Sequence, residues 1–429
     1  MFLFYNPEVM EMMIKKAEIL CVGTEILIGD IVNTNAAWLS KELSALGISQ
    51  YHQAVIGDNS ERLAQTVKDT LNNCDLLVMT GGLGPTYDDI TKETVASVLG
   101  KELVFDREIF DGIKAYFDKR DRTMTENNRK QAYVIEGSKV LKNDMGTAPG
   151  ILCNTGEKII ILLPGPPSEL MPMWKNYARP EIEKYCDKVF VSKNVNIVGM
   201  GEAAVASELD EMMKNSVNPT IAPYCKTGET RLRITASAKT KEEAQKMCDD
   251  VIEKIKNTKI NNYIYGIDTD IAEAVVKELT KRGLKIATAE SCTGGLIAKM
   301  ITDVPGASAV LEGGMISYSN SVKYKALGVS SSLLDRHGPY DHRVAIQMAE
   351  GVRRLMDSDV GIGVTGLAGP GGGTAKKPVG LVYIAVCYNK KTEVMKYKFG
   401  ENQSRDRIRE LTAVNAFINT LNILKKGQK

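Results

Sequence analysis

Apolar runs that end in glycine-rich turns constrain the fold of this 429-residue chain more than any other feature. Such runs stand at 75–80, 284–287 and 360–364, and small residues follow each of them. Amphipathic helical patterns that end at a glycine, such as 35–46 before Gly47, lie between strand-like segments. Alternating strands and helices predict parallel sheets with functional sites at the carboxyl ends of the strands. We therefore predict an α/β fold.

The length predicts about three domains, since a domain takes roughly 150 residues. Residues 14–170 and 262–425 each carry the alternating α/β pattern. Residues 171–258 read as strand, helix, two strands and helix, which is the order of a small α+β domain. We predict domain boundaries at these positions.

Composition narrows the class of partner and the compartment. With 55 basic and 53 acidic residues the net charge is only +2, so no large basic face is expected and a small-molecule partner is favoured. The eight cysteines are scattered, which argues against a disulfide framework or a structural zinc site and for a reducing cytoplasm. No apolar run reaches about 18 residues, so we expect no membrane span. The opening Met1–Pro7 is too short to predict a signal peptide.

The first glycine-rich turn, Gly81–Asp89 (GGLGPTYDD), combines two features of phosphate chemistry. Glycines allow backbone N–H groups to approach a phosphate, and adjacent carboxylates can hold a hard divalent cation. The alternative is a plain glycine turn before a capped helix. Three further segments adjoin predicted strands and favour the phosphate site, namely 23–35, 146–150 and 163–169.

Taken together, these segments resemble the molybdopterin-binding fold of the N-terminal domain in the competence/damage-inducible CinA family. The resemblance covers about residues 15–170 and implies a three-layer α/β domain that hydrolyses ADP-ribose pyrophosphate with Mg, Mn or Co. It implies metal binding and water activation at Asp88 and Asp89, with Glu25 a weaker candidate, and it leaves open which aspartate binds the metal. By the same resemblance, the phosphates would be lined by Gly81, Gly82, Gly84 and Thr86.

The middle segment contains Gly199-Met200-Gly201-Glu202, which is similar to the GxxG clamp of KH domains. Glu202 is acidic where a phosphate would have to approach, and basic residues are not concentrated there. CinA-family proteins have a KH-like fold in this position. We therefore expect a linker or a homodimer-forming role here, and not direct binding of nucleic acid.

The second glycine-rich turn places Ser291 between an apolar run and a helical pattern that starts near Leu296. Free N–H groups and the helix dipole favour an anion or a developing oxyanion there. Ser291 could attack a substrate, or it could only cap the helix. The third turn, 365–374, is also rich in glycine, and we expect both turns to line one pocket. Arg405 could complete a phosphate clamp or lie on a solvated helix face.

A serine nucleophile needs a base, and histidine offers little support. His52 lies in the first domain, and His337 and His342 lie in a polar loop. The alternative base is a desolvated lysine. Lys323 follows Tyr318 on a predicted helix, and Tyr318 could relay or orient the proton.

Residues 262–425 also resemble the C-terminal domain of the CinA family, through the motifs AESCTGG, PGAS, YSNSVK, VTGLAGPGGGT and KPVG. Stand-alone relatives of this domain are nicotinamide mononucleotide deamidases. The resemblance implies hydrolysis of nicotinamide mononucleotide to nicotinate mononucleotide and ammonia, without a metal. Ser291 would attack, Lys323 would accept the proton, and N–H groups around Thr293 to Gly295 would hold the oxyanion. Further expected substrate-binding residues are Ser308, which is also the fallback nucleophile, and Thr293, Gly294, Thr365, Gly366, Gly372, Thr374 and Arg405.

One segment departs from the family pattern. Pro339-Tyr340-Asp341-His342 stands where relatives often have an Ala-Val-Ser turn. Asp341 preserves a helix cap, whereas Tyr340 and His342 leave the shape of the loop open.

Two other functions compete with this interpretation. The N-terminal domain could be a pterin- or nucleotide-binding module, or the protein could be a scaffold for competence or recombination. The balanced charge argues against direct contact with DNA.

Overall fold

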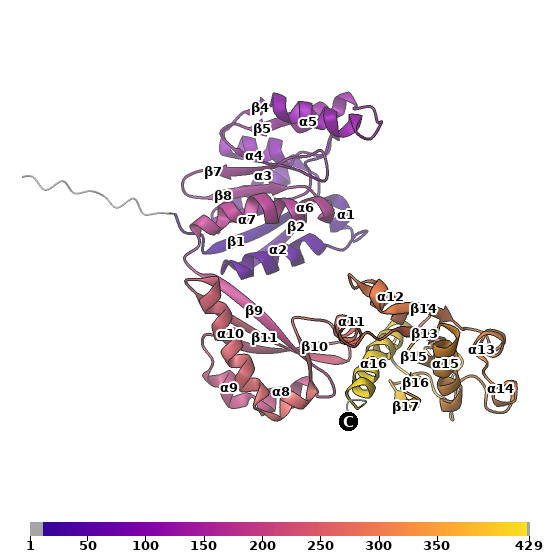
Figure 1. The fold of residues 1–429 in the computed structure, drawn as a ribbon. Coiled ribbons are helices and arrows are strands. Elements are labelled where there is room, and N and C mark those ends of the chain that lie inside the picture. The colour runs from indigo at the N-terminus through magenta and orange to yellow at the C-terminus, as the bar shows by residue number, and fades with distance from the viewer. Residues whose placement is uncertain (1–11, 427–429) are drawn as a thin grey trace, which may run out of the picture. The chain divides into compact units, whose positions relative to one another are not determined.

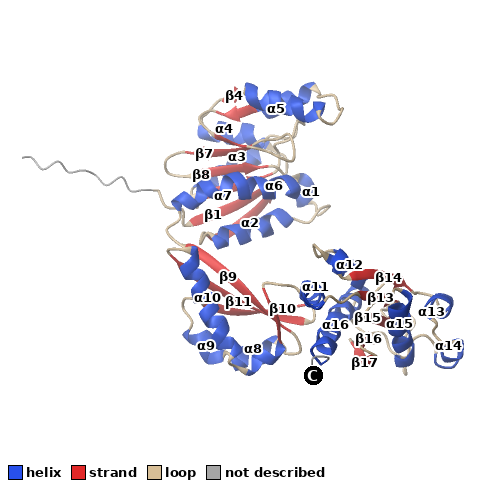
Figure 2. Cartoon of the chain, in the orientation of Figure 1, coloured by secondary structure: helices blue, strands red, loops and turns tan. Residues whose placement is uncertain are grey.

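The computed structural model describes residues 12–426, which divide into two units. The first unit contains the residues up to Val191 together with Ala236–Met247, and the second contains Ser192–Thr235 and the residues from Cys248 onward. Figure 1 labels the elements and Figure 2 separates helices from strands by colour. The segment Met1–Pro7 lies outside the described residues.

The N-terminal domain is built on a six-stranded sheet of order β2-β1-β3-β8-β7-β6. Neighbouring strands among β2, β1, β3 and β8 are parallel, whereas β7 and β6 pair antiparallel. The strands are β1 (Lys16–Val22), β2 (Ser49–Ile56), β3 (Leu76–Thr80), β6 (Lys139–Leu141), β7 (Gly150–Asn154) and β8 (Ile159–Leu163), with a separate pair β4 (Leu103–Phe105) and β5 (Tyr133–Ile135).

Helices cover both faces of this sheet. The helices are α1 (Thr24–Leu27), α2 (Thr34–Ala45), α3 (Ser60–Leu71), α4 (Thr91–Leu99), α5 (Arg107–Asp118), α6 (Pro167–Met173) and α7 (Arg179–Ile182), with short helical turns at Glu126–Ala132, Trp174–Ala178 and Glu183–Tyr185. Successive side chains of β1 point to opposite faces, so Ile19 packs in the core with Leu39 of α2 and Leu20 packs with Leu63 of α3. This is the predicted three-layer α/β arrangement.

The middle domain has a four-stranded sheet of order β10-β11-β9-β12. Its elements are β9 (Val189–Ile197), α8 (Glu202–Glu208), α9 (Asp210–Asn215), β10 (Thr220–Lys226), β11 (Glu229–Ala238), α10 (Lys241–Lys256), a helical turn at Lys259–Tyr263 and β12 (Ile264–Ile267). The predicted α+β order is confirmed, with two differences. The expected single helix is divided near Leu209, and the expected connector adds a strand because β12 pairs with β9.

The C-terminal domain has a five-stranded sheet of order β14-β13-β15-β16-β17, in which the first three strands are parallel and the last two antiparallel. Its elements are α11 (Ile271–Arg282), β13 (Ile286–Glu290), α12 (Leu296–Thr302), a helical turn at Ala307–Ala309, β14 (Leu311–Ile316), α13 (Asn320–Leu327), α14 (Ser331–His337), α15 (His342–Leu355), β15 (Val360–Gly366), β16 (Leu381–Tyr388), β17 (Lys391–Lys398) and α16 (Arg405–Lys426). Ile286 packs with α11 and α16 on one face, and Ala287 packs with α15 on the other.

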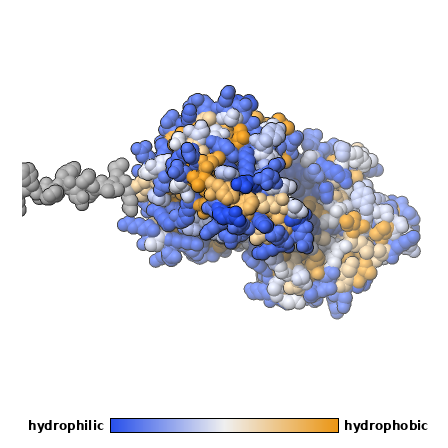
Figure 3. All heavy atoms as spheres, turned by 90° about the horizontal axis from the view of Figure 1, so that it is seen from above, coloured by the Kyte–Doolittle hydropathy of each residue, from blue (hydrophilic) through white to orange (hydrophobic). Residues whose placement is uncertain are grey.

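The surface is mostly hydrophilic (Figure 3), as expected when most apolar residues are buried in the cores of the domains. Figure 3 shows a mostly hydrophilic surface that is interrupted by small groups of hydrophobic residues. None of the helices in the described part of the chain combines the length and apolar content that a membrane span requires.

Two candidate catalytic sites

In the C-terminal domain, Ser291 follows the last residue of β13 and lies beside Lys323. The Ser291 N–H donates to the carbonyl oxygen of Val364, which ties the turn to β15 (3.0 Å). Lys323 is fully buried in the first turn of α13. Its Nζ donates to Ser291 Oγ (3.2 Å) and to the carbonyl oxygens of Ser317 (2.7 Å) and Tyr318 (3.0 Å). The fold thus brings together the two residues that the sequence selected.

The surroundings of Lys323 raise the neutral fraction of its amine. Burial lowers the pKa of Lys323 to about 8, because the charged form loses its hydration. Within the described residues the amine has no ion-pair partner that would hold its proton. A lysine in this state can accept a proton from a serine hydroxyl.

The helix N-terminus behind Ser291 is occupied by a buried carboxylate. Glu290 is 1% exposed and accepts hydrogen bonds from the N–H groups of Gly295 (3.0 Å), Ile297 (3.1 Å) and Ala298 (2.9 Å). A carboxylate in this position interacts favourably with the helix dipole. Its acceptor role was not predicted from the sequence, although an acidic residue just before a helix start was the available signal.

This carboxylate changes where an oxyanion could be held. Oxyanion donors were expected from Thr293 to Gly295, but the Gly295 N–H is bonded to Glu290 and the Gly294 N–H to the carbonyl oxygen of Ser291. In the described structure, the N–H groups of this turn that remain unpaired are those of Cys292 and Thr293. The candidate oxyanion donors are therefore the N–H groups of Cys292 and Thr293, the two residues that follow Ser291 directly.

The two glycine-rich turns do line one cavity, of about 170 Å³. The lining residues are Ser291, Cys292, Tyr318, Lys323, Pro339, Tyr340, Gly366–Gly369, Gly371, Gly372 and Arg405. Arg405 Nη1 donates to the carbonyl oxygen of Gly369 (2.7 Å), so the arginine holds the glycine loop as well as lining the cavity.

Two predicted substrate-binding threonines have other partners. Thr365 Oγ1 donates to the carbonyl oxygen of Pro339 (2.8 Å), which fixes the loop before α15, and Thr365 does not line the cavity. Thr374 forms a turn in which its hydroxyl accepts from the N–H of Lys377 (3.1 Å). Both residues are bonded within loops, and neither belongs to the lining of the cavity.

Tyr318 and Ser308 also differ from expectation. Tyr318 lines the cavity, but its contact with Lys323 is made by its backbone carbonyl, and the residue is 63% exposed. Ser308 is exposed and precedes β14, whose residue Leu311 pairs with Ile286 at the start of β13. Ile286 precedes Ser291 by five residues, which is about 16 Å along an extended strand, so Ser308 lies near the opposite end of the sheet from Ser291. The fold does not bring Ser308 to this cavity.

The divergent loop at 339–342 contributes to the cavity wall. Pro339 and Tyr340 line it, whereas His342 does not. Asp341 caps α15 as predicted, because its side chain accepts from the N–H of Arg343 (3.0 Å). The Arg343 guanidinium lowers the pKa of Asp341 to about 2.

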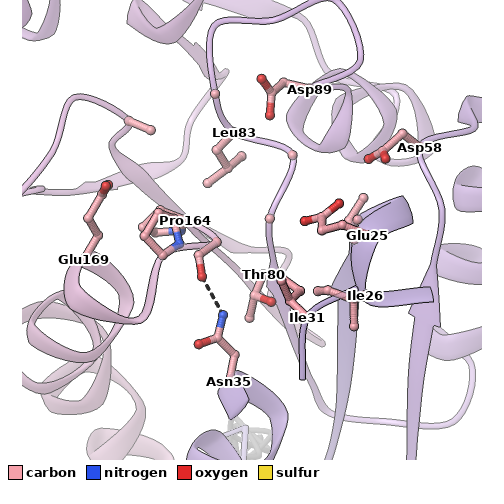
Figure 4. Close-up of a pocket in the computed structure, with 18 of the residues that line it drawn as sticks. Glu25, Ile26, Ile31, Asn35, Asp58, Thr80, Leu83, Asp89, Pro164 and Glu169 are labelled. Atoms are coloured by element: carbon pink, nitrogen blue, oxygen red, sulfur yellow. Dashed lines mark hydrogen bonds between the residues drawn. The ribbon is translucent and has the colours of Figure 1, made fainter. Parts of the chain in front are cut away.

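In the N-terminal domain, a cavity of about 540 Å³ lies at the carboxyl ends of β1, β3 and β8 (Figure 4). All four glycine-containing segments selected from the sequence contribute to its lining. The lining residues come from 23–35 after β1, from the end of β3 and the turn that follows it (80–89), from Thr147 and Ala148, and from 164–169 after β8.

The glycine turn after β3 offers only part of the expected phosphate cradle. The Gly81 N–H donates to the carbonyl oxygen of Leu163 (3.0 Å), and a Cβ at Gly81 would overlap the Val22 carbonyl oxygen, so this glycine is required for strand packing. The N–H groups of Gly82, Leu83 and Gly84 have no partner in the described part of the chain and remain as candidate phosphate donors.

Thr86 organises the two aspartates at the end of this turn. Its hydroxyl lies within hydrogen-bonding distance of Asp88 Oδ1 and of Asp89 Oδ2 (2.5 Å), and its N–H donates to Asp89 Oδ2 (2.8 Å). The hydrogen bond from Thr86 lowers the pKa of Asp88 below its usual value. The Thr86 hydroxyl is therefore engaged with the carboxylates and is not free for a phosphate.

The cavity is strongly acidic. Its lining includes five carboxylates, namely Glu25, Asp58, Asp88, Asp89 and Glu169, and no lysine, arginine or histidine from the described residues. Sequence reasoning did not select Asp58, and it included Glu169 only as the end of the segment 163–169, without a metal-binding role. Asp58 accepts from Thr24 N and Oγ1 (3.0 and 2.8 Å), and Glu169 accepts from Asn143 Nδ2 (2.7 Å). Their positions just after the strands β2 and β8 were the available signal.

This donor set fits a hard divalent cation in its chemistry, since carboxylate oxygens are the ligands such ions prefer. In the arrangement described for residues 12–426, however, no three acidic, histidine or cysteine side chains are grouped to hold a metal ion. Glu25, Asp88 and Asp89 line the same cavity without forming such a group.

Comparisons with known proteins match the three domains in turn. The chain matches the family models "Probable molybdopterin binding domain" over residues 18–184, "Damage-inducible protein CinA KH domain" over 192–266 and "CinA C-terminal domain" over 268–424. These ranges follow the same order as the predicted domains.

Full-length relatives show the same combination. A putative competence-damage inducible protein of Clostridium acetobutylicum is 45% identical over 93% of this chain and 97% of its own length. A CinA-like protein of Dictyoglomus turgidum is 45% identical over 96% of this chain and 99% of its own length. A crystal structure of the competence/damage inducible protein CihA from Agrobacterium tumefaciens covers 36% of this chain and 93% of its own at 38% identity, with a TM-score of 0.35. Because relatives 45% identical align over nearly their whole length, this chain belongs to the CinA family.

Proposed function

We propose that the C-terminal domain hydrolyses the amide of nicotinamide mononucleotide to nicotinate mononucleotide and ammonia. The observation that carries this proposal is the buried Lys323 amine, 3.2 Å from Ser291 Oγ and without an ion-pair partner among the described residues. This pair is the nucleophile and base that amide hydrolysis by a serine needs.

The reaction would proceed in two steps. Ser291 Oγ would attack the carboxamide carbon while Lys323 accepts the hydroxyl proton, and the N–H of Cys292 is a candidate donor to the oxyanion. Lys323 returns the proton to the departing nitrogen, and ammonia leaves an ester on Ser291. Water then attacks this ester with Lys323 as base, which releases nicotinate mononucleotide and restores the serine hydroxyl. The glycine loop held by Arg405 is the candidate site for the ribose phosphate.

One assay tests this function directly. The purified full-length protein is incubated with nicotinamide mononucleotide, with and without a chelator. The amounts of ammonia and of nicotinate mononucleotide are then measured. Equimolar products in both conditions support the proposal. Absence of both products at all pH values between 6 and 9 would overturn it.

The N-terminal cavity supports a second function, hydrolysis of ADP-ribose with a divalent metal. The five carboxylates that line the cavity would repel a pyrophosphate, and the neighbouring Lys130 amine donates to the carbonyl oxygens of Thr86 and Asp89, so an added positive charge would favour binding there. Asp88 and Asp89, with Glu25, are the candidate ligands, and a bound cation would supply charge neutralisation at the phosphates. The unpaired N–H groups of Gly82 and Gly84 would orient the phosphate oxygens.

Release of AMP from ADP-ribose in the presence of Mg²⁺, Mn²⁺ or Co²⁺ tests this second function. Binding of the nucleotide without AMP release would instead favour a binding module.

We also propose that the protein is a homodimer, and sedimentation of the full-length protein checks this oligomeric state.

A further inference from the structure

The start of helix α16 carries two arginines, and each of them holds one of the two glycine-rich turns of the C-terminal domain. Arg405 and Arg409 stand one helical turn apart, so their side chains leave the same face of α16. Arg405 Nη1 donates to the carbonyl oxygen of Gly369. Arg409 reaches the turn that contains Ser291, although it stands 116 residues after Thr293 in the chain. One helix therefore contacts both of the turns that line the cavity.

Arg409 holds a single carbonyl group with two donors. Its Nε (3.2 Å) and its Nη2 (3.0 Å) both donate to the carbonyl oxygen of Thr293. The N–H of Leu296 donates to the same oxygen at 3.3 Å. The Thr293 hydroxyl does not tether the turn, because its Oγ1 is buried without a partner among the described residues. Hydrogen bonds from a charged donor are stronger than those from a neutral one, so we expect Arg409 to provide the main contact on this peptide group.

The turn is held from two sides by side chains of opposite charge. The Glu290 carboxylate accepts from three N–H groups at the start of α12, and the Arg409 guanidinium donates to a carbonyl oxygen. Between them the turn closes on itself through a hydrogen bond from the Gly294 N–H (3.2 Å). In the described part of the chain, Cys292 and Thr293 then carry the N–H groups of this turn that lack a partner. Donors that are fixed before the reaction need no rearrangement when charge develops on the substrate.

We propose that Arg409 is a positioning residue of the deamidase site, which fixes the Ser291 turn and thereby holds the N–H groups of Cys292 and Thr293 in place for the oxyanion. Arg409 does not line the cavity, so it acts through the turn and not by contact with the substrate. Displaced donors lower the rate and leave ground-state binding almost unchanged, because the oxyanion exists only along the reaction path. This inference rests on the proposed deamidase function for its substrate, whereas the choice of residue comes from the geometry of the turn.

The first test measures kcat and KM for ammonia release from nicotinamide mononucleotide by the full-length protein. Arg409→Met keeps a long side chain and removes both donors, so kcat should fall about 10- to 100-fold. KM, and the inhibition constant of nicotinate mononucleotide, should stay within about threefold of the wild type. Arg409→Lys keeps the charge but not the two aligned donors, so its kcat should fall about 3- to 10-fold. A purely structural role would not give a graded loss of kcat at unchanged product binding and melting temperature.

Arg407→Met is the matched control. Arg407 lies on the same helix, and its guanidinium donates to Thr227 Oγ1 (2.5 Å) and not to the Ser291 turn. The substitution removes the same charge, and kcat should stay within about twofold of the wild type. Unchanged kcat in Arg409→Met, or an equal loss in Arg407→Met, would overturn the positioning role. A higher KM with unchanged kcat would also overturn it, because Arg409 would then act in substrate binding.

A second readout uses no nicotinamide substrate. Methanesulfonyl fluoride labels a serine when Oγ bonds to sulfur, fluoride leaves, and the hydroxyl proton is released with it. Negative charge grows on the sulfonyl oxygens during this step, so the same N–H donors assist it. Labelling of Ser291, followed by the mass of the protein and of its peptides, should slow by about fivefold or more in Arg409→Met. It should keep the wild-type rate in Arg407→Met.

The two readouts separate this inference from the proposed function. If the wild type releases no ammonia but Ser291 labelling depends on Arg409, the deamidase function fails and the positioning role stands. If Arg409→Met releases ammonia as fast as the wild type, the positioning role fails and the function stands. A wild type that neither releases ammonia nor is labelled at Ser291 would overturn both. Should Arg409→Met fail to fold, Arg409→Lys decides, because wild-type kcat in that variant would overturn the need for two aligned donors.

Discussion

Lys323 differs from most lysines in that its amine is fully buried and contacts a serine hydroxyl and two carbonyl oxygens. A neighbouring carboxylate would raise the pKa of such an amine and keep it charged, whereas burial lowers the pKa of Lys323. The sequence indicated Lys323 as a base only through its place after a strand and through family resemblance. Its burial depends on packing between α13 and the sheet, which spacing along the chain does not reveal.

The pKa of Lys323 predicts a pH dependence for the deamidase. Because only the neutral amine can accept the Ser291 proton, kcat/KM for nicotinamide mononucleotide should rise about tenfold per pH unit below the pKa of about 8. It should level off above that pH. The measurement is the initial rate of ammonia release from pH 6 to 9.5. A profile that is flat across this range would contradict the assignment of Lys323 as base.

Removal of either member of the pair should abolish deamidation. Ser291→Ala and Lys323→Ala should each lower kcat for ammonia release by about 10⁴-fold or more, since residues of a catalytic unit act together. Lys323→Met is a second variant that fills the buried space without an amine. AMP release from ADP-ribose provides the control for folding, and it should be unchanged. Retained deamidation in Ser291→Ala or Lys323→Met would rule out this pair.

At the scale of elements, the turn between β13 and α12 depends on Glu290. Its carboxylate accepts three N–H groups of a helix that has only seven residues, so a large part of the helix N-terminus is paired by one side chain. Among the described residues, the N–H groups of Cys292 and Thr293 are then the donors of this turn that have no partner. The cap thus connects the stability of α12 with the shape of the candidate active site.

Glu290→Gln tests this connection. Glutamine keeps the size of the side chain but loses the charge, and its NH₂ group faces N–H donors, so we expect a loss of about 2 kcal/mol in the free energy of unfolding. Urea denaturation measures this loss. Glu312→Gln is the control, because Glu312 forms an exposed ion pair with Lys285 and should contribute less than about 1 kcal/mol. Equal effects of both substitutions would show that the three hydrogen bonds of Glu290 do not stabilise the turn.

Elements and the broad location of the sites could be predicted from the sequence, whereas individual contacts could not. The run Asp75–Thr80 indicated a strand of the N-terminal sheet, and the turns at Ser291 and Thr365 indicated strand ends of the C-terminal sheet. Each cavity lies at the carboxyl ends of the strands of its own sheet. Strand register decides the rest, because pairing of Leu311 with Ile286 sends Ser308 to the far end of the sheet. The hydrogen bond from the Thr365 hydroxyl to the Pro339 carbonyl oxygen likewise depends on the folded arrangement and not on the local sequence.

At the scale of the whole molecule, one chain contains two cavities of opposite chemistry. The cavity of the N-terminal domain is lined by five carboxylates and by no basic residue of the described chain. The cavity of the C-terminal domain is lined by Lys323 and Arg405, and its described lining contains no carboxylate. The only other ionisable groups there are Tyr318, Tyr340 and Cys292 among the described residues, and burial raises the pKa of Cys292 to about 12.

These linings predict that a chelator separates the two activities. Carboxylates bind hard divalent cations, and the described lining of the C-terminal cavity offers none. In one sample of full-length protein, EDTA should therefore reduce AMP release from ADP-ribose to background and leave ammonia release from nicotinamide mononucleotide within about twofold of its initial rate. Added Mg²⁺, Mn²⁺ or Co²⁺ should restore the first activity only. Loss of ammonia release with EDTA, and its recovery with metal, would mean that the C-terminal cavity uses an ion for which its lining offers no carboxylate, and the serine–lysine mechanism would then need revision.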